Sequence, residues 1–408
     1  MRILLINSVC GAGSTGKIVR GLYDYYIKKG HAAAVAYGRG ADFREENILR
    51  FSPVWEVWLH AGLTRLTGLT GVYSPLATRR LLRFIDEFRP DIIHLHELHA
   101  YFINVIAILE YLKRLKIMVV WTFHCEFMYT GKCAHASGCP NWQKGCGACP
   151  RLREYPASWF FDWTAAMFRA KKRVMEGFES LVIVSPSRWL AGRIRQSFFQ
   201  NFPVEVIPNG IDTEIFRPRA VPAPLSESRL EGRRIILAVA PGLMSNRKGG
   251  RWVLDLAHRL LDRPYKFILV GVEDTSQSFP ENVMALGYVA SQSELAAYYS
   301  LAEVTLLVSE KETFSMVCAE SLCCGTPIVG FESGAPPEVA PAGYGRFVPY
   351  GDLEALEKAV VGIISGREPL SSPEACHDFG RGRYARETMA GKYLELYEKM
   401  LMKAGPVS

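Results

Sequence analysis

The sequence contains no long apolar run. None of its 408 residues lies in a stretch approaching the roughly 20 apolar residues that span a bilayer. Residues 1–7 are too short for a signal-peptide core and end in a polar loop. There is also no internal repeat of fixed period and no long low-complexity tract. We therefore expect a cytoplasmic globular protein, in which the ten cysteines are mostly free thiols or metal ligands.

Acidic residues are scarce in the first half of the chain. Residues 1–200 contain 27 Lys and Arg but 15 Asp and Glu, whereas the remainder contains 21 and 26. The basic half is expected to face something anionic, which leaves nucleic acid, anionic lipid and phosphorylated substrates open. Solvated helix faces are the alternative explanation. The apolar fraction of 49% indicates a folded protein, and the length indicates two domains.

Apolar β-type runs alternate with helical patterns from start to end. This alternation predicts an α/β fold with two doubly wound, Rossmann-like domains built on parallel sheets. Pro, Asn and Gly interrupt the pattern at residues 206–212, so we divide the chain into residues 1–212 and 213–385. Ligands bind at the carboxyl ends of such strands, which predicts a site in an interdomain cleft. The strands are expected at residues 3–6, 33–37, 92–95, 118–123, 181–184, 235–240, 266–270, 304–308 and 327–331.

Two glutamates flank the most informative motif. Glu312 follows the apolar run 304–308, and Glu320 lies eight positions later within a helical pattern. The amides of residues 313–316 open that helix, and a helix N-terminus suits a phosphate group. Carboxylates on either side of such amides are able to bind hydroxyls on both sides of a diphosphate. The motif therefore predicts a nucleotide-sugar site.

Four cysteines lie within 17 residues of the first half. Their number and spacing match a tetrahedral structural zinc site within the Cys-rich loop 129–150. Disulfides and unligated thiols are the open alternatives. The candidate ligands are Cys133, Cys139, Cys146 and Cys149.

Two apolar segments have basic neighbours. Residues 54–66 are amphipathic at helical spacing, and residues 159–173 combine aromatic side chains with a basic run. Ordinary helix burial is the simpler interpretation of each segment alone. Together with the basic first half, they also suggest shallow docking on an anionic membrane.

The glutamate pair, the Asn-Gly-Ile-Asp run at 209–212 and the Arg-Lys-Gly run at 247–249 together resemble family 4 glycosyltransferases, which have the GT-B fold. The histidine-rich runs at 91–99 and 121–124 and the Cys-rich loop are similar to a subgroup that includes colanic acid and exopolysaccharide glycosyltransferases. The resemblance covers nearly the whole chain.

This resemblance implies a retaining transfer of a sugar from a UDP- or GDP-type donor to an acceptor hydroxyl. It places the donor in the C-terminal domain and the acceptor in the N-terminal domain, and it requires no cofactor for catalysis. A lipid-linked glycan in exopolysaccharide, capsule or O-antigen synthesis is the acceptor we expect, with peripheral contact at the inner face of the cell membrane. Residues 386–408 are expected to form a helix that packs back toward the first domain.

The resemblance also assigns residues to roles. Glu312 lies beside the donor sugar, Lys248 neutralises the diphosphate, and His124 contacts the donor sugar near the reaction centre. Gly13 belongs to the first Gly-rich loop, which approaches donor phosphate or acceptor. The remaining donor-binding candidates are Arg247, Tyr288, Val289, Phe314, Ser315 and Glu320.

One expected feature is missing. Relatives carry an arginine five or six positions before the lysine, where this chain has Leu243 and Gly242. Arg247 is a candidate replacement.

Two other functions remain open: a nucleotide-sugar epimerase or hydrolase of the same fold, and a zinc-containing nucleic-acid binder. No RNA- or DNA-binding module is evident, so we do not expect a nucleic-acid partner.

Overall fold

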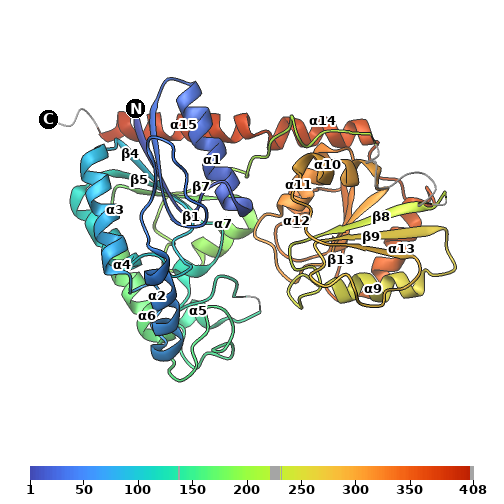
Figure 1. Cartoon of the computed structure of the whole chain (residues 1–408), viewed down its shortest axis with the longest axis horizontal. Helices are drawn as coiled ribbons and strands as arrows, with labels where there is room; N and C mark the ends of the chain where they lie inside the picture. The colour runs from blue at the N-terminus through green and yellow to red at the C-terminus, as the bar shows by residue number, and fades with distance from the viewer. Residues whose placement is uncertain (137, 221–229, 231, 405–408) are drawn as a thin grey trace. The chain divides into compact units, whose positions relative to one another are not determined.

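The chain forms two compact α/β units. A computed structural model describes residues 1–136, 138–220, 230 and 232–404. The first unit comprises Met1–Ile207 and the chain from Met389 onward, and the second comprises Pro208–Thr388. Each unit contains one parallel sheet with helices wound around it (Figure 1). The structure thus confirms the prediction of two doubly wound sheets.

The first sheet has seven parallel strands in the order β3-β2-β1-β4-β5-β6-β7. Its central strands are buried on both faces, as apolar runs in a doubly covered sheet require. The strands are β1 (Arg2–Val9), β2 (Ala32–Arg39), β3 (Ile48–Arg50), β4 (Ile92–Leu95), β5 (Met118–Thr122), β6 (Leu181–Ser185) and β7 (Val204–Val206).

Local sequence signals set the helix ends of this unit. Pro75 lies in the first turn of α3, and Asn104 and Ser187 cap α4 and α7 by accepting backbone N–H groups. The helices are α1 (Gly13–Lys28), α2 (Val54–Thr67), α3 (Pro75–Phe88), α4 (Val105–Leu115), the 3-10 turn η1 (Phe127–Tyr129), α5 (Asn141–Lys144), α6 (Thr164–Met175) and α7 (Arg188–Arg195).

The C-terminal helix α15 (Arg386–Ala404) is fastened to the first sheet by buried tyrosines. The hydroxyl of Tyr397 lies 2.6 Å from Nδ1 of His94 on β4 and 3.2 Å from the hydroxyl of Tyr26 on α1. The hydroxyl of Tyr393 lies 2.8 Å from Oγ1 of Thr122 on β5. The last helix therefore completes the core of the first unit.

The second sheet has six parallel strands in the order β10-β9-β8-β11-β12-β13. Ser291, Asp352 and Ser372 cap its helices α10, α13 and α14. The strands are β8 (Arg234–Val239), β9 (Tyr265–Val270), β10 (Val283–Leu286), β11 (Val304–Leu307), β12 (Ile328–Phe331) and β13 (Gly345–Val348). The helices are α9 (Gly250–Arg259), α10 (Gln292–Leu301), α11 (Met316–Cys323), α12 (Pro336–Val339), α13 (Leu353–Ile364) and α14 (Pro373–Tyr384).

The structure corrects two expectations from the sequence. Four strands were not predicted, namely β3, β7, β10 and β13, and these are the outermost strands of the two sheets. The helix within residues 54–66 is present, but Val54, Trp55, Trp58, Leu59 and Leu66 are exposed while Glu56 and His60 are buried, so ordinary burial of an apolar face is wrong for this segment. Across the residues that the structure describes, no helix has the length and apolar character to cross a membrane.

We predict that Tyr397→Phe destabilises the first unit. The change leaves Nδ1 of buried His94 without its hydroxyl partner, which costs about 1–3 kcal/mol. Urea unfolding, followed by hydrogen–deuterium exchange of β4 and β5, measures the effect. Tyr350→Phe removes the same hydroxyl from a partly exposed ring and is the matched control. Equal unfolding midpoints for the two variants would contradict this account of α15.

Candidate functional site

Three loops meet at the carboxyl edge of the second sheet. They follow the neighbouring strands β8, β11 and β12. The amide of Glu310 donates to the carbonyl of Arg247 (2.9 Å), which joins the first two loops. The amide of Glu312 donates to the carbonyl of Ser333 (2.8 Å), which joins the second and third. Backbone hydrogen bonds therefore fix the three loops relative to one another, and with them the positions from which their side chains extend.

Lys248 and Glu312 form an ion pair at this edge. The lysine Nζ lies 2.7 Å from Oε1 of Glu312, and about one sixth of each side chain is exposed. Burial acts to raise the pKa of Glu312, but the Lys248 charge and hydrogen bonds from Lys248 and Ser309 outweigh it and hold that pKa below its ordinary value. The carboxylate stays ionised, and the lysine charge is held in one place.

A glycine turn positions the lysine. The amides of Lys248 and Gly249 both donate to the carbonyl of Ser245, at 3.0 and 2.9 Å. Gly249 has a φ of +75°, and a Cβ there would lie 2.3 Å from the carbonyl oxygen of Val308. Only glycine fits this close approach between the first two loops. In the Lys-Gly pair of the sequence, Gly249 is therefore required by the backbone geometry, and Lys248 supplies the charge.

The N-terminus of α11 lies directly after Glu312 in the chain. Ser315 has a φ of +85° and accepts a hydrogen bond from the amide of Cys318 (3.4 Å). The Phe314 ring is buried and contacts the Tyr384 ring at 5.8 Å between centroids. Its side chain therefore belongs to the core, and its backbone is the part available for anion binding. The helix dipole adds partial positive charge here.

Glu320 lies on α11 beside a buried tyrosine. The hydroxyl of Tyr299 donates to its Oε2 at 3.0 Å. Burial, and then the Glu320 carboxylate, raise the pKa of Tyr299 well above its ordinary value, so the phenol keeps its proton. Tyr299 orients the carboxylate and was missed from the sequence, because the Ala-Ala-Tyr-Tyr run at 296–299 gives no signal for this contact.

Three other donor-binding candidates lie on loops of the second unit. Arg247 is exposed, and its backbone carbonyl is used to join the loops. Tyr288 is 78% exposed after β10, and Val289 packs against the core. Leu243, one of the two positions at which the resemblance led us to expect an arginine, is buried in the core.

His124 lies in a buried histidine row of the first unit. Its Nε2 lies 3.0 Å from Nδ1 of His96, with the two rings stacked. His94 bonds to Thr122 (2.8 Å) and Tyr397, so it is structural. Burial lowers the pKa of His124 to about 4, although the charge of Glu97 opposes the shift. His124 is therefore a neutral hydrogen-bonding group near pH 7.

A second titratable group lies next to this row. Glu97 is buried and contacts His99 and the thiol of Cys125, the latter at 3.3 Å. Burial acts to raise the pKa of Glu97, but the adjacent His99 outweighs it and lowers that pKa to about 2. Among the described residues, this is the one group of three or more potential metal ligands whose ligand atoms all lie within 4.8 Å of one another.

Gly13 begins α1 after β1 of the first unit. It is exposed, has a φ of +61°, and a Cβ there would meet no atom within 4 Å. The backbone of this loop is therefore open to a ligand.

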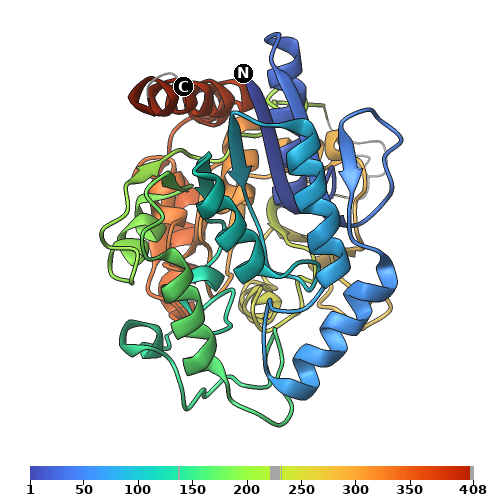
Figure 2. The same cartoon turned by 90° about the vertical axis from the view of Figure 1, so that its left-hand side faces the viewer.

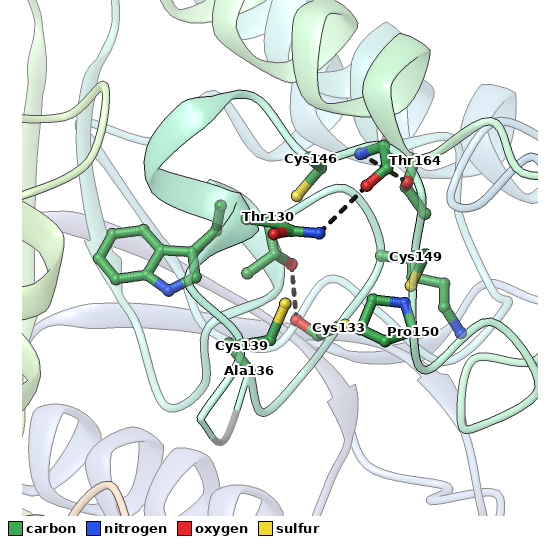
Figure 3. Close-up of a pocket in the computed structure, with 12 residues that line it drawn as sticks. Thr130, Cys133, Ala136, Cys139, Cys146, Cys149, Pro150 and Thr164 are labelled. Carbon is green, nitrogen blue, oxygen red and sulfur yellow. Dashed lines mark hydrogen bonds between the residues drawn. The ribbon is translucent and has the colours of Figure 1, made fainter.

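The four candidate zinc ligands line a single cavity. Cys133, Cys139, Cys146 and Cys149 surround a space of about 20 Å³ together with Thr130 and Thr164 (Figure 3). The amide of Gly131 donates to Sγ of Cys146 at 3.1 Å. Cys133 and Cys149 are hydrogen-bond partners. All four cysteines line this cavity, but no three of their sulfur atoms all lie within 4.8 Å of one another.

A buried ion pair that the sequence did not reveal secures this loop. Glu126 is fully buried and lies 2.5 Å from Nε of Arg193 on α7. Its other oxygen accepts from the amide of Ala136 (2.6 Å), and Tyr129 donates to the carboxylate at 2.9 Å. The sequence alone does not indicate this ion pair, because Arg193 lies 67 residues from Glu126.

Comparisons with known proteins agree with this architecture. The model of "Glycosyltransferase Family 4" matches residues 15–215, and that of "Glycosyl transferases group 1" matches residues 233–365. A protein of Escherichia coli K12 that is named as a colanic acid biosynthesis glycosyl transferase, WcaC, is 24% identical over 98% of this chain and 100% of its own. An α-(1→4)-mannosyltransferase of Mycolicibacterium hassiacum is 31% identical over 49% of each chain.

Solved structures share the fold. Sucrose-phosphate synthase of Thermosynechococcus elongatus has a TM-score of 0.69 at 18% identity and covers 99% of this chain and 100% of its own. HepE of Anabaena, solved in complex with UDP-glucose, has a TM-score of 0.65 at 15% identity over 98% and 100% of the two chains. The matching models, the relative of nearly full length and the two parallel sheets lead to one conclusion: this chain belongs to the glycosyltransferases and has the GT-B fold.

Proposed function

We propose that this chain is a retaining family 4 glycosyltransferase that moves a sugar from a UDP- or GDP-type donor to a glycan acceptor. The observation that carries the proposal is the Lys248–Glu312 ion pair at the carboxyl edge of the second sheet, next in sequence to the N-terminus of α11. An ammonium held by backbone-fixed loops beside the N-terminus of a helix suits a diphosphate. The HepE complex with UDP-glucose supports a nucleotide-sugar donor.

Lys248 has the central role in this proposal. Transfer breaks the bond between the sugar and the diphosphate, and the negative charge on the leaving diphosphate must be stabilised as it develops. Lys248 supplies a compact positive charge, and the amides around Phe314 and Ser315 supply hydrogen-bond donors. Glu312 holds the lysine before the donor arrives and then binds sugar hydroxyls. These groups do the work that a divalent cation does in other transferases, so catalysis needs no cofactor.

The nucleoside end of the donor is assigned to residues around β10 and α11. Glu320, oriented by Tyr299, binds the ribose hydroxyls. Tyr288 and Val289 border the base, with the Tyr288 ring exposed to it. Arg247, also exposed, is the candidate for a second positive charge on the diphosphate, because positions 242 and 243 carry no arginine.

The acceptor is assigned to the first unit. We propose a lipid-linked glycan used in polysaccharide synthesis at the inner face of the cell membrane, since the nearly full-length relative is named for colanic acid biosynthesis. Two residues of the first unit are assigned to the donor: Gly13 to donor binding, and neutral His124 to the donor sugar near the reaction centre. A neutral imidazole orients a hydroxyl group by hydrogen bonding, without adding charge.

Glu312→Gln should lower turnover far more than it changes nucleotide binding. The amide keeps the shape but no longer fixes the lysine or binds the sugar as a carboxylate, so the rate is expected to fall by about 100-fold or more. Release of nucleoside diphosphate from a panel of UDP- and GDP-sugars, with and without glycan acceptor, measures turnover. Thermal shift with UDP and GDP measures binding.

Glu310→Gln is the matched control, since Glu310 lies in the same loop and its amide alone is used to join the loops. Equal loss in both variants, or full activity of Glu312→Gln, would contradict the assignment. Release of nucleoside diphosphate that does not depend on an acceptor would favour a hydrolase or epimerase of the same fold.

We further propose that the four-cysteine cavity holds a structural zinc ion. Tetrahedral zinc takes four thiolates, and about 20 Å³ is room for one ion but not for a substrate. The Gly131 amide already donates to a cysteine sulfur, as partners of zinc-bound thiolates do. Small rotations of the side chains would bring the sulfur atoms to the ion. Such a site would fasten the loop that Glu126 anchors at its other end.

Elemental analysis of the purified chain is expected to find one zinc per molecule. Cys139→Ser or Cys146→Ser should remove the metal and lower the melting temperature, because each takes away one of four ligands. Cys125→Ser is the discriminating control and should keep the zinc. Loss of zinc in Cys125→Ser alone would assign the metal to the Glu97, His99 and Cys125 group, and a zinc-free wild-type chain would end the proposal.

A further inference from the structure

Helix α2 exposes an apolar stripe to solvent and buries polar side chains. Its apolar residues at positions 55, 58, 59 and 66 fall on one stripe of the helix, and all are exposed. Trp58 is 72% exposed and Trp55 57%. Single exposed apolar residues are common, but a stripe of two tryptophans and two leucines along one helix marks an interaction surface.

The polar side chains on the opposite face of α2 are buried and hydrogen-bonded. Both carboxylate oxygens of Glu56 accept backbone amides at the start of α3, from Leu76 and Ala77 at 2.9 Å each. Nδ1 of His60 lies 2.8 Å from Oγ of Ser74. Hydrogen bonds therefore fix the helix with its tryptophans outward, and turning the apolar stripe inward would break them. The exposure is built into the fold.

A second aromatic segment adjoins this stripe. The amide of Trp159 donates to the carbonyl of Arg65 near the end of α2 at 2.8 Å. A Cβ on Gly68 would lie 2.3 Å from the carbonyl oxygen of Phe161, so the loop is packed against the helix end. Figures 1 and 2 both show α2 and the chain before α6 at the same end of the first unit. We call this surface the aromatic ridge: Trp55, Trp58, Leu59, Leu66, Trp159, Phe160, Phe161 and Trp163.

Basic residues flank the aromatic segment in the sequence, before it and along α6. Arg153, Arg169, Lys172 and Arg173 are exposed, and none forms an ion pair within the described residues. The two nearby acids are already engaged. Asp162 accepts from the amides of Cys149 (2.6 Å) and Thr164 (3.0 Å), and Glu154 pairs with Arg151. Asp162 keeps its negative charge, but residues 151–173 contain six Lys and Arg against two Asp and Glu, so the net charge of this segment is positive.

We propose that the aromatic ridge inserts into the surface of an anionic bilayer. Tryptophan is enriched at the membrane–water interface, and burying each large apolar side chain there is favourable. Exposed arginines and lysines beside the apolar groups bind anionic headgroups, which gives the second attachment that stable peripheral binding needs. This inference does not depend on the proposed donor chemistry, because lipid binding is measured without substrate.

Flotation of the full chain with vesicles tests the proposal. Vesicles of phosphatidylcholine with phosphatidylglycerol should bind the chain, phosphatidylcholine alone should bind it more weakly, and added salt should weaken the binding. The double variant Trp58→Ser, Phe160→Ser should lower the partition coefficient by at least about tenfold, since two exposed side chains no longer enter the bilayer. Both residues are exposed, so their loss should not unfold the chain.

Met402→Ser, which changes an equally exposed apolar residue on α15, is the matched control and should bind as the wild type does. Brominated lipids should quench the tryptophan fluorescence of the wild type and not that of the double variant. The proposal is overturned if the wild type stays unbound at every vesicle composition, or if the double variant floats equally well. It is also overturned if the double variant instead disperses an oligomer seen by light scattering, which would make the ridge an interface between copies of the chain.

Discussion

Parallel strand pairing is the constraint on which the candidate donor site depends. Because β8, β11 and β12 are neighbours and run in one direction, their three loops leave the sheet at one edge. Two backbone hydrogen bonds then tie these loops together and bring Lys248 to Glu312 from 64 residues away. The glycine turn at Gly249 permits the close contact with the β11 loop. Because the fold already holds the Lys248 ammonium in place, this charge need not move when negative charge develops on a leaving diphosphate.

The two units use burial in different ways. In the second unit, a partly buried ion pair keeps charge available at the sheet edge. In the first unit, burial keeps the row of His94, His96 and His124 neutral, and tyrosines of α15 hold one end of that row in place. The excess positive charge of the first half lies instead on the surface, part of it beside the aromatic ridge.

The sequence predicted the central strands, the two-sheet fold and the motif around Glu312, because buried parallel strands form continuous apolar runs with polar loops at their ends. It did not predict β3, β7, β10 and β13, which are edge strands, short and partly exposed, so their apolar signal is weak. Tyr299 and Arg193 could not be assigned either, since their partners come from distant segments. The apolar stripe of α2 was visible, but whether it faced inward depended on the contacts of Glu56 and His60, which only the structure shows.

The central claim is that Lys248 binds the diphosphate of the donor. Calorimetric titration of the wild type with UDP and UMP, and with GDP and GMP, measures what the second phosphate adds to the affinity. The account predicts that a diphosphate binds more tightly than the matching monophosphate to the wild type, and that Lys248→Met removes most of this difference while monophosphate binding changes little. An undiminished preference for the diphosphate in Lys248→Met would contradict the claim.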